Sequence, residues 1–210
     1  MFKKLKTIIT DFAEKIGVIK TALTNSTQRI MKEADYSDDY KLKECARLKD
    51  TYRAERKQLT DQGKAAIAAV FDDLFASFDA AITADVGQDA FTDLRTLADA
   101  SPSDYEINAY AKKYSGKYRA LRELSESARA AGIPFSFVPE ADMRGALNDL
   151  RGKCERFLDV YEGEQPVNDY YMRMLYMSAT DTIRDGNMFA NIERMYTDFT
   201  SPTVRRLQES

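Results

Sequence analysis

The sequence predicts an all-α fold in which a long, coiled-coil-like N-terminal helical hairpin projects from a compact helical body. Apolar residues in the first 30 positions recur at alternating spacings of three and four, the pattern of a helix that packs along a partner helix. The one stretch with strand character lies between Pro134 and Pro139, and four residues between prolines cannot build a sheet. We therefore expect a hairpin arm over residues 1–83 and a helical body over residues 84–210.

The first helix is expected from about Phe2 to Glu33. Small polar residues of poor helix propensity occupy positions 24–27, which leaves open a continuous helix or a kink there. The seam predicts packing against another helix, and its first five apolar residues are candidate protein-contact residues. The seam consists of Phe2, Leu5, Ile9, Phe12, Ile16, Ile19, Leu23, Ser26 and Ile30.

The second helix is expected from Asp38 to about Thr83, with Ser37 as its N-cap. Its apolar stripe is narrow from Cys45 to Ala66 and then becomes broad, so the second part must enter a core. The narrow stripe matches the seam of the first helix and favours antiparallel pairing within one chain. Pairing between chains remains the alternative.

The body is expected to consist of shorter helices that end at glycine- and proline-containing breaks. One of them should begin with Ser101 as N-cap and Pro102 at the first helical position. The residues 135–138 are interpreted as an extended loop that buries Phe135 and Phe137. The expected body helices cover about 89–98, 102–114, 118–128, 140–161 and 168–199, the last with a break near 185–187.

The C-terminal third holds five of the eight methionines, beside four tyrosines and Phe199. Methionine fills irregular gaps in cores and also forms adaptable contact surfaces. An ordinary helical core and a partner-binding face therefore both fit this composition. The candidate contact residues of this region are Tyr170, Tyr171, Met174, Met177, Met188 and Tyr196.

Charge is distributed unevenly, although the net charge is only −3. Residues 1–64 hold 15 lysines and arginines against 10 acidic residues, whereas residues 65–210 hold 16 against 24. Acidic residues recur at helical spacing among the cations of the arm, which favours ion pairs within the helix. Contact of the basic arm with an acidic protein surface, including the body of a neighbouring copy, is therefore favoured over contact with nucleic acid.

The sequence lacks the residue types and motifs of the common catalytic sites. The chain has no histidine, which excludes Ser-His-Asp and Cys-His catalysis and the usual imidazole metal sites. No phosphate-binding glycine loop occurs, and adjacent acids such as Asp38 and Asp39 point about 100° apart on a helix. We expect no enzyme activity, no catalytic residue, no cofactor and no metal site.

The location of the protein is inferred from its N-terminus, its apolar runs and its cysteines. Basic and apolar residues are interleaved in the first twelve positions, unlike a signal peptide, and no apolar run approaches the length of a membrane span. Cys45 and Cys154 are far apart in the chain and are expected to be buried thiols in a reducing compartment. The expected location is therefore a reducing cytoplasm, with no membrane contact.

The segment Ser101–Glu123, SPSDYEINAYAKKYSGKYRALRE, resembles a short module of small helical structural proteins of tailed bacteriophages. The resemblance implies a non-enzymatic role in the virion head or its assembly, and with it a location in the virion or the host cytoplasm. Such a protein would act by self-association or by binding a phage coat or portal protein. Two other functions stay open: a soluble inhibitor that binds a host enzyme, of the anti-defence type, and a nucleic-acid-binding helical module.

Overall fold

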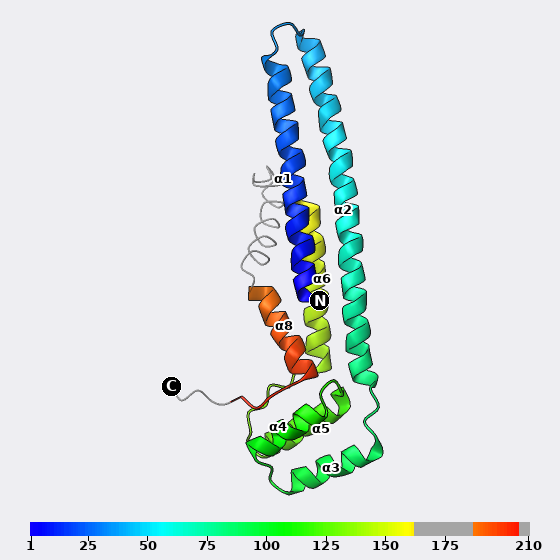
Figure 1. Ribbon diagram of the computed structural model, residues 1–210, viewed down its shortest axis with the longest axis vertical. Coiled ribbons are helices and arrows are strands. Elements are labelled where there is room, and N and C mark those ends of the chain that lie inside the picture. Colours follow the sequence, from blue (N-terminus) through cyan, green and yellow to red (C-terminus); the bar gives the residue numbers. More distant parts are fainter. Residues whose placement is uncertain (162–186, 206–210) are drawn as a thin grey trace, which may run out of the picture. The chain divides into compact units, whose positions relative to one another are not determined.

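The computed structural model describes residues 1–161 and 187–205 of the chain. These residues form helices joined by turns, with one isolated β-bridge and no strand among them. The predicted all-α class and the two long N-terminal helices are confirmed, and α1 continues without a break through positions 24–27. The helices are α1 (Phe2–Lys32), α2 (Asp38–Thr83), α3 (Gln88–Asp99), α4 (Asp104–Lys113), α5 (Tyr118–Ala130), α6 (Glu140–Val160) and α8 (Asn187–Thr200) (Figure 1).

The chain forms two compact units, and each unit combines segments that are distant in the sequence. Unit 1 comprises Met1–Phe71 and Leu150–Asn187, and unit 2 comprises Asp72–Asp149 and Met188–Ser210. Helices α2 and α6 therefore contribute residues to both units. Helical segments that are distant in the sequence therefore pack together within one unit.

In unit 1, α1 lies beside α2 and runs in the opposite direction (Figure 1). The turn between them closes at Ser37, whose Oγ accepts a hydrogen bond from the Tyr40 N–H at 3.3 Å. This bond satisfies one of the free N–H groups at the start of α2. The predicted N-cap is therefore confirmed, and α1 pairs with α2 of the same chain.

The second half of α6 completes the core of unit 1. The Phe12 ring of α1 lies 6.4 Å from the Phe157 ring and 6.3 Å from the Tyr161 ring, between ring centroids. Gly63 of α2 faces the same place, where a Cβ atom would stand 2.9 Å from Cδ1 of Leu158 and 3.6 Å from Cδ2 of Phe12. The missing side chain at Gly63 therefore lets the three helices approach one another closely.

In unit 2, α5 packs against α3 and α4. The apolar faces of these three short helices meet in one cluster, which removes their leucine and alanine side chains from water and so stabilises the unit. The buried members of the cluster are Ala90, Leu94, Leu97, Ile107, Ala111, Tyr114, Ala120, Leu121, Leu124 and Ala128.

Ser103, and not the predicted Ser101, is the N-cap of α4. The Ser103 Oγ accepts from the Glu106 N–H at 3.4 Å, and the Glu106 carboxylate accepts from the Ser103 N–H at 2.9 Å. This reciprocal pair of bonds satisfies two backbone donors at once, which is the reason that Ser-x-x-Glu determines the start. The prediction of Ser101 as N-cap was wrong because only Ser103 has a glutamate three residues later to complete the reciprocal pair; the residue three positions after Ser101 is Asp104, the first residue of α4.

A run of aromatic rings connects α2, α8, α5 and the segment after α5. Phe199 stacks on Phe78 at 4.7 Å and on Tyr118 at 5.1 Å, and Tyr118 lies 5.5 Å from Phe137, between ring centroids. The Tyr118 hydroxyl also accepts a hydrogen bond from the Glu140 N–H at 3.0 Å, at the start of α6. One aromatic side chain thereby contributes both to the core and to a helix terminus.

The predicted extended segment 135–138 exists, but its burial differs from the prediction. Phe135 forms an antiparallel bridge with Val204. Ser136 is 4% exposed, whereas Phe135 and Phe137 are only half-buried against the core. Pairing with the C-terminal segment turns Ser136 inward, where its Oγ accepts from the Thr203 N–H at 2.9 Å. The expectation that both phenylalanines are buried against the helices is therefore met only in part.

Candidate interaction surfaces

The five seam residues predicted to contact a partner lie inside the protein itself. Each is at most 6% exposed, and Leu5 and Ile16 have no exposed surface. These side chains contribute to the chain's own core, so another protein would reach them only if α1 moved away. Their role in contact with another chain stays a prediction. The residues are Phe2, Leu5, Ile9, Phe12 and Ile16.

The seam beyond Ile16 is only partly covered. Ile19, Leu23 and Ile30 are half-buried, and a hollow of about 140 Å³ lies between this part of α1 and the residues Leu48–Glu55 of α2. Two helices alone cannot enclose an apolar seam, because each covers only one side of the other. This part of the hairpin therefore keeps an accessible apolar edge.

The C-terminal candidates are placed only in part. Met188 and Tyr196 lie half-buried on α8. Burial raises the pKa of Tyr196, and its hydroxyl forms a hydrogen bond with Ser77 of α2. Tyr196 thus already packs within unit 2. The other four candidates lie outside the described residues: Tyr170, Tyr171, Met174 and Met177.

The turn between α1 and α2 exposes a cluster of apolar side chains that the sequence analysis did not select. We name the residues 31–42 the hairpin tip. Met31, Tyr36, Tyr40 and Leu42 are exposed by 53%, 42%, 47% and 68%, four of the seven large apolar residues exposed within the described ranges. Exposed apolar residues are normally scattered singly, so four of them within twelve residues of the chain make the hairpin tip a candidate contact surface.

The apolar residues of the tip lie on more than one face. The Tyr36 and Tyr40 rings meet edge to face at 4.7 Å between centroids. Leu42 is two residues beyond Tyr40 on α2, which places it about 200° around the helix axis. A tip with apolar groups on opposite faces is better buried by insertion into a groove than by contact with a flat surface.

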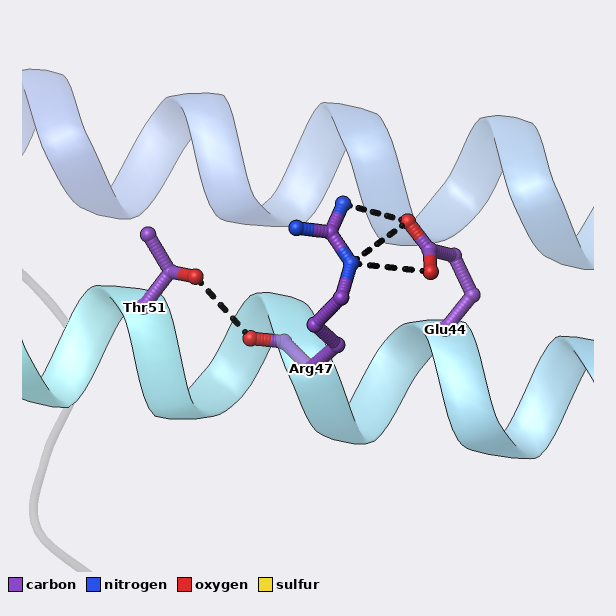
Figure 2. Close-up of polar contacts among 3 residues, drawn as sticks. All are labelled: Glu44, Arg47 and Thr51. Atoms are coloured by element: carbon purple, nitrogen blue, oxygen red, sulfur yellow. Dashed lines mark hydrogen bonds and ion pairs between the residues drawn. The ribbon is translucent and has the colours of Figure 1, made fainter.

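The charged residues of the arm form ion pairs within α2, as predicted from their spacing. Figure 2 shows Arg47 with both carboxylate oxygens of Glu44, at 3.0 and 2.9 Å from its Nε, while Thr51 Oγ1 donates to the Arg47 carbonyl at 3.0 Å. The bond from Arg47 lowers the pKa of Glu44. Comparable pairs join Arg53 to Asp50 at 3.0 Å and Lys57 to Asp61 at 2.9 Å. Exposed pairs of this kind add little stability each, but they neutralise cations that would otherwise contact phosphates.

Lysines at the start of α1 occupy an unfavourable place. Lys3, Lys4 and Lys6 are exposed, the first turn has no acidic residue, and the N-cap Met1 has no side-chain hydrogen bond. Positive charge at this end opposes the helix dipole, at about 0.3–1 kcal/mol for each side chain. These lysines therefore reduce the stability of the helix and leave its end strongly basic.

Unit 2 carries a groove along α5. One hollow of about 440 Å³ lies between α3 and α5. Residues of α3 on one side are Phe91, Leu94, Arg95 and Ala98, and residues of α5 on the other are Glu123, Glu126, Ser127 and Ala130. A second hollow of about 460 Å³ shares Glu126 and reaches the half-buried phenylalanines of the extended segment. We name the first hollow the α3–α5 groove. Its volume and mixed lining fit one or two side chains of a partner.

The two units carry opposite charge. Over its whole range unit 1 holds 20 lysines and arginines against 17 acidic residues, and unit 2 holds 11 against 17. The formal charges are therefore +3 and −6. Surfaces of opposite sign attract in solution and accelerate their encounter.

Other kinds of site find no support in the described part of the chain. Cys45 and Cys154 are buried free thiols, as predicted, and burial raises the pKa of Cys154 to about 12. No group of three metal-ligating side chains occurs among residues 1–161 and 187–205. In the same residues, every helix is too short or too polar to cross a membrane.

Comparison with protein-family models, with curated proteins and with solved structures finds no match to this chain.

Proposed function

We propose that this protein is a non-enzymatic structural or assembly protein that acts by binding other protein chains. The observation that carries the proposal is the hairpin tip, where four large apolar side chains cluster within twelve residues. A loop that joins two helices needs no such residues for its own folding. Exposing them costs solubility, which is acceptable where a partner covers them.

The charges of the hairpin support a protein partner over a nucleic acid. Three basic residues of α2 already pair with neighbouring carboxylates, namely Arg47, Arg53 and Lys57. A surface that tracks a phosphate backbone needs cations in excess along its length, because affinity comes from the release of counterions. The exposed apolar residues of the hairpin tip and the mixed charges of α2 therefore fit a groove on a protein better than they fit a nucleic acid.

We further propose that the partners belong to the head of a tailed bacteriophage, with a coat or portal protein or a second copy of this chain as the bound molecule. The support for this assignment is the resemblance of Ser101–Glu123. In the structure that segment comprises the approach to α4, all of α4, and the first half of α5. It contributes Ile107 and Leu121 to the core of unit 2.

The test measures association of the purified full chain, alone and with any coat or portal protein that is encoded beside its gene. Sedimentation velocity at several micromolar concentrations should reveal self-association or a complex with one of these proteins. A double substitution at exposed positions, Tyr36→Ser with Tyr40→Ser, should weaken that association without loss of helix content. A chain that remains monomeric and binds neither protein would refute the proposal.

A further inference from the structure

We propose that two copies of this chain form a dimer in which their hairpins pack face to face and antiparallel, with α1 against α1. The two-fold axis of this dimer crosses the contact near Ile19, close to the middle of α1. The inference rests on the proposed assembly function and specifies a second copy as a partner. The contact surface is a stripe of α1 that runs along the hairpin.

The stripe lies on an accessible face of α1. Its residues follow one another at spacings of three or four, which places them on one side of the helix. Each of their side chains is exposed or half-buried, unlike the five buried residues of the seam. We name these residues the α1 stripe: Lys4, Ile8, Asp11, Lys15, Ile19, Ala22, Ser26, Arg29 and Glu33.

Two hollows lie beside the α1 stripe, between α1 and α2. The first has a volume of about 210 Å³ and is lined by Ile8 and Lys15 of α1 and by Leu59 of α2, among others. The second has a volume of about 140 Å³ and is lined by Ile19 of α1 and Leu48 of α2, among others. Because the two hollows follow one another along the hairpin, together they suit a helix better than a single side chain.

The charges of the α1 stripe identify a second copy as the partner. Lys4 and Glu33 lie 15 and 14 residues from Ile19, on opposite sides of it. Asp11 and Arg29 lie 8 and 10 residues from Ile19, also on opposite sides. When two stripes run antiparallel across Ile19, Lys4 of each copy therefore meets Glu33 of the other, and Asp11 meets Arg29. The stripe is thus complementary to its own reversed copy.

The fifth charge of the stripe and the parallel alternative are consistent with this pairing. Lys15 faces residues 21–27 of the other copy, which carry no charge. In a parallel dimer, by contrast, every charge of the stripe would face the same charge of the other copy. Such like-charge contacts oppose association, so the antiparallel direction is favoured.

The two ends of the hairpin complement each other in the same direction. Residues 1–10 hold three lysines and no acidic residue, whereas residues 33–39 hold four carboxylates and no basic residue. Antiparallel packing places these carboxylates over the start of α1 in the other copy. There they offset the lysines and interact favourably with the helix dipole, a role that no acidic residue of the first turn of α1 fills.

The contact is isologous, because both copies use the same stripe. From residue 4 to residue 33 the stripe extends about 44 Å, at 1.5 Å per residue. An isologous contact of this kind closes on itself, so further copies cannot add through the same surface. The expected product is a dimer rather than a ring or an open chain.

A charge-swap experiment with the full chain tests the inference by sedimentation velocity. The first variant carries Lys4→Glu and Arg29→Glu, and the second carries Asp11→Lys and Glu33→Lys. Each variant alone should dimerise roughly tenfold or more weakly than the wild type, because like charges then meet at the contact. An equimolar mixture of the two variants should dimerise again, as should a single chain with all four substitutions.

A matched control carries Arg53→Glu and Lys57→Glu, which makes the same change of charge as the first variant. These residues follow Thr51 and Glu55 of the second hollow by two positions, so they lie about 200° around α2 from its lining. The control should dimerise nearly as well as the wild type. A control that loses as much affinity as the first variant would show that overall charge, and not the α1 stripe, governs association, and would overturn the inference.

Two further results would overturn the inference and leave the proposed function to be decided by binding to a coat or portal protein. One is a wild type that stays monomeric at high micromolar concentration. The other is a wild-type dimer that neither variant weakens, as expected if the copies pack in parallel or through another surface. Circular dichroism of every variant verifies that its helix content is retained, so that a loss of association reports on the contact.

Discussion

Gly63 provides the sharpest test of the packing in unit 1, through comparison with Gly17. Both glycines lie inside long helices, where alanine is intrinsically favoured by about 1 kcal/mol. A Cβ at Gly17 meets no described atom within 4 Å, whereas a Cβ at Gly63 would lie 2.9 Å from the buried Leu158 side chain. Gly17→Ala should therefore stabilise the protein by about 1 kcal/mol.

Gly63→Ala should behave differently, because it gains the same helix propensity but overpacks the core. Overpacking costs about 1–3 kcal/mol, so the net effect is a loss of about 0–2 kcal/mol. Leu158→Ala alone should cost about 2–5 kcal/mol, because it leaves a cavity. In the Leu158→Ala background the alanine at position 63 has room, and there Gly63→Ala should become stabilising by about 1 kcal/mol.

Urea unfolding followed by circular dichroism measures the stability of five proteins: the wild type, Gly17→Ala, Gly63→Ala, Leu158→Ala and the double variant Gly63→Ala/Leu158→Ala. Their unfolding midpoints are compared at constant slope. The decisive quantity is the change of sign of the Gly63→Ala effect between the two backgrounds. If Gly63→Ala stabilises the otherwise wild-type chain as much as Gly17→Ala does, then the close approach of α2 and α6 is not real. The reasoning about this core would then fail.

Three further predictions concern single buried groups. Ser136→Ala should lower the free energy of unfolding by about 1–3 kcal/mol, because it leaves the Thr203 N–H without its acceptor; an unchanged urea midpoint would contradict this. Thr60→Val should raise the free energy of unfolding by about 1 kcal/mol, since the buried Thr60 hydroxyl has no hydrogen-bond partner in the described residues, and a lower melting temperature would contradict it. Burial raises the pKa of Cys154 from 9.0 to about 12. Between these two pH values the folded state keeps the thiol proton and the unfolded state loses it. The free energy of unfolding should therefore fall as the pH rises from 9.0 to about 12. At neutral pH the Cys154 thiol should react with a maleimide only as fast as the chain unfolds, and rapid labelling of the native protein would show that the thiol is accessible.

Local sequence signals predicted much of the helical structure. The start of α2 at Asp38 follows from Ser37, whose side chain bonds to the Tyr40 N–H three residues later. Gly132 after α5 adopts φ 71°, a left-handed conformation that glycine reaches without strain. The error at the start of α4 was avoidable, because the Ser-x-x-Glu pattern begins at Ser103 and not at Ser101.

The candidate surfaces were harder to predict, because periodicity identifies an apolar face but not what covers it. The seam of α1 reads as a contact surface, yet Phe12 packs on Phe157 and Tyr161, about 150 residues away in the chain. Conversely, Tyr36 and Tyr40 belong to no periodic stripe, and only their exposure in the folded protein shows them as an apolar cluster.

The amino-acid sequence by itself determined the fold class, the approximate positions of most described helices, the intrahelical ion pairs and the uneven distribution of charge. These features depend on residues within four positions of one another or on composition alone. Tertiary structure decided that residues after Leu150 join unit 1, that Ser136 rather than its phenylalanine neighbours is buried, and that the hairpin tip stays exposed. These outcomes depend on contacts between distant segments, whose free energy comes from burying surface that neither segment could bury alone.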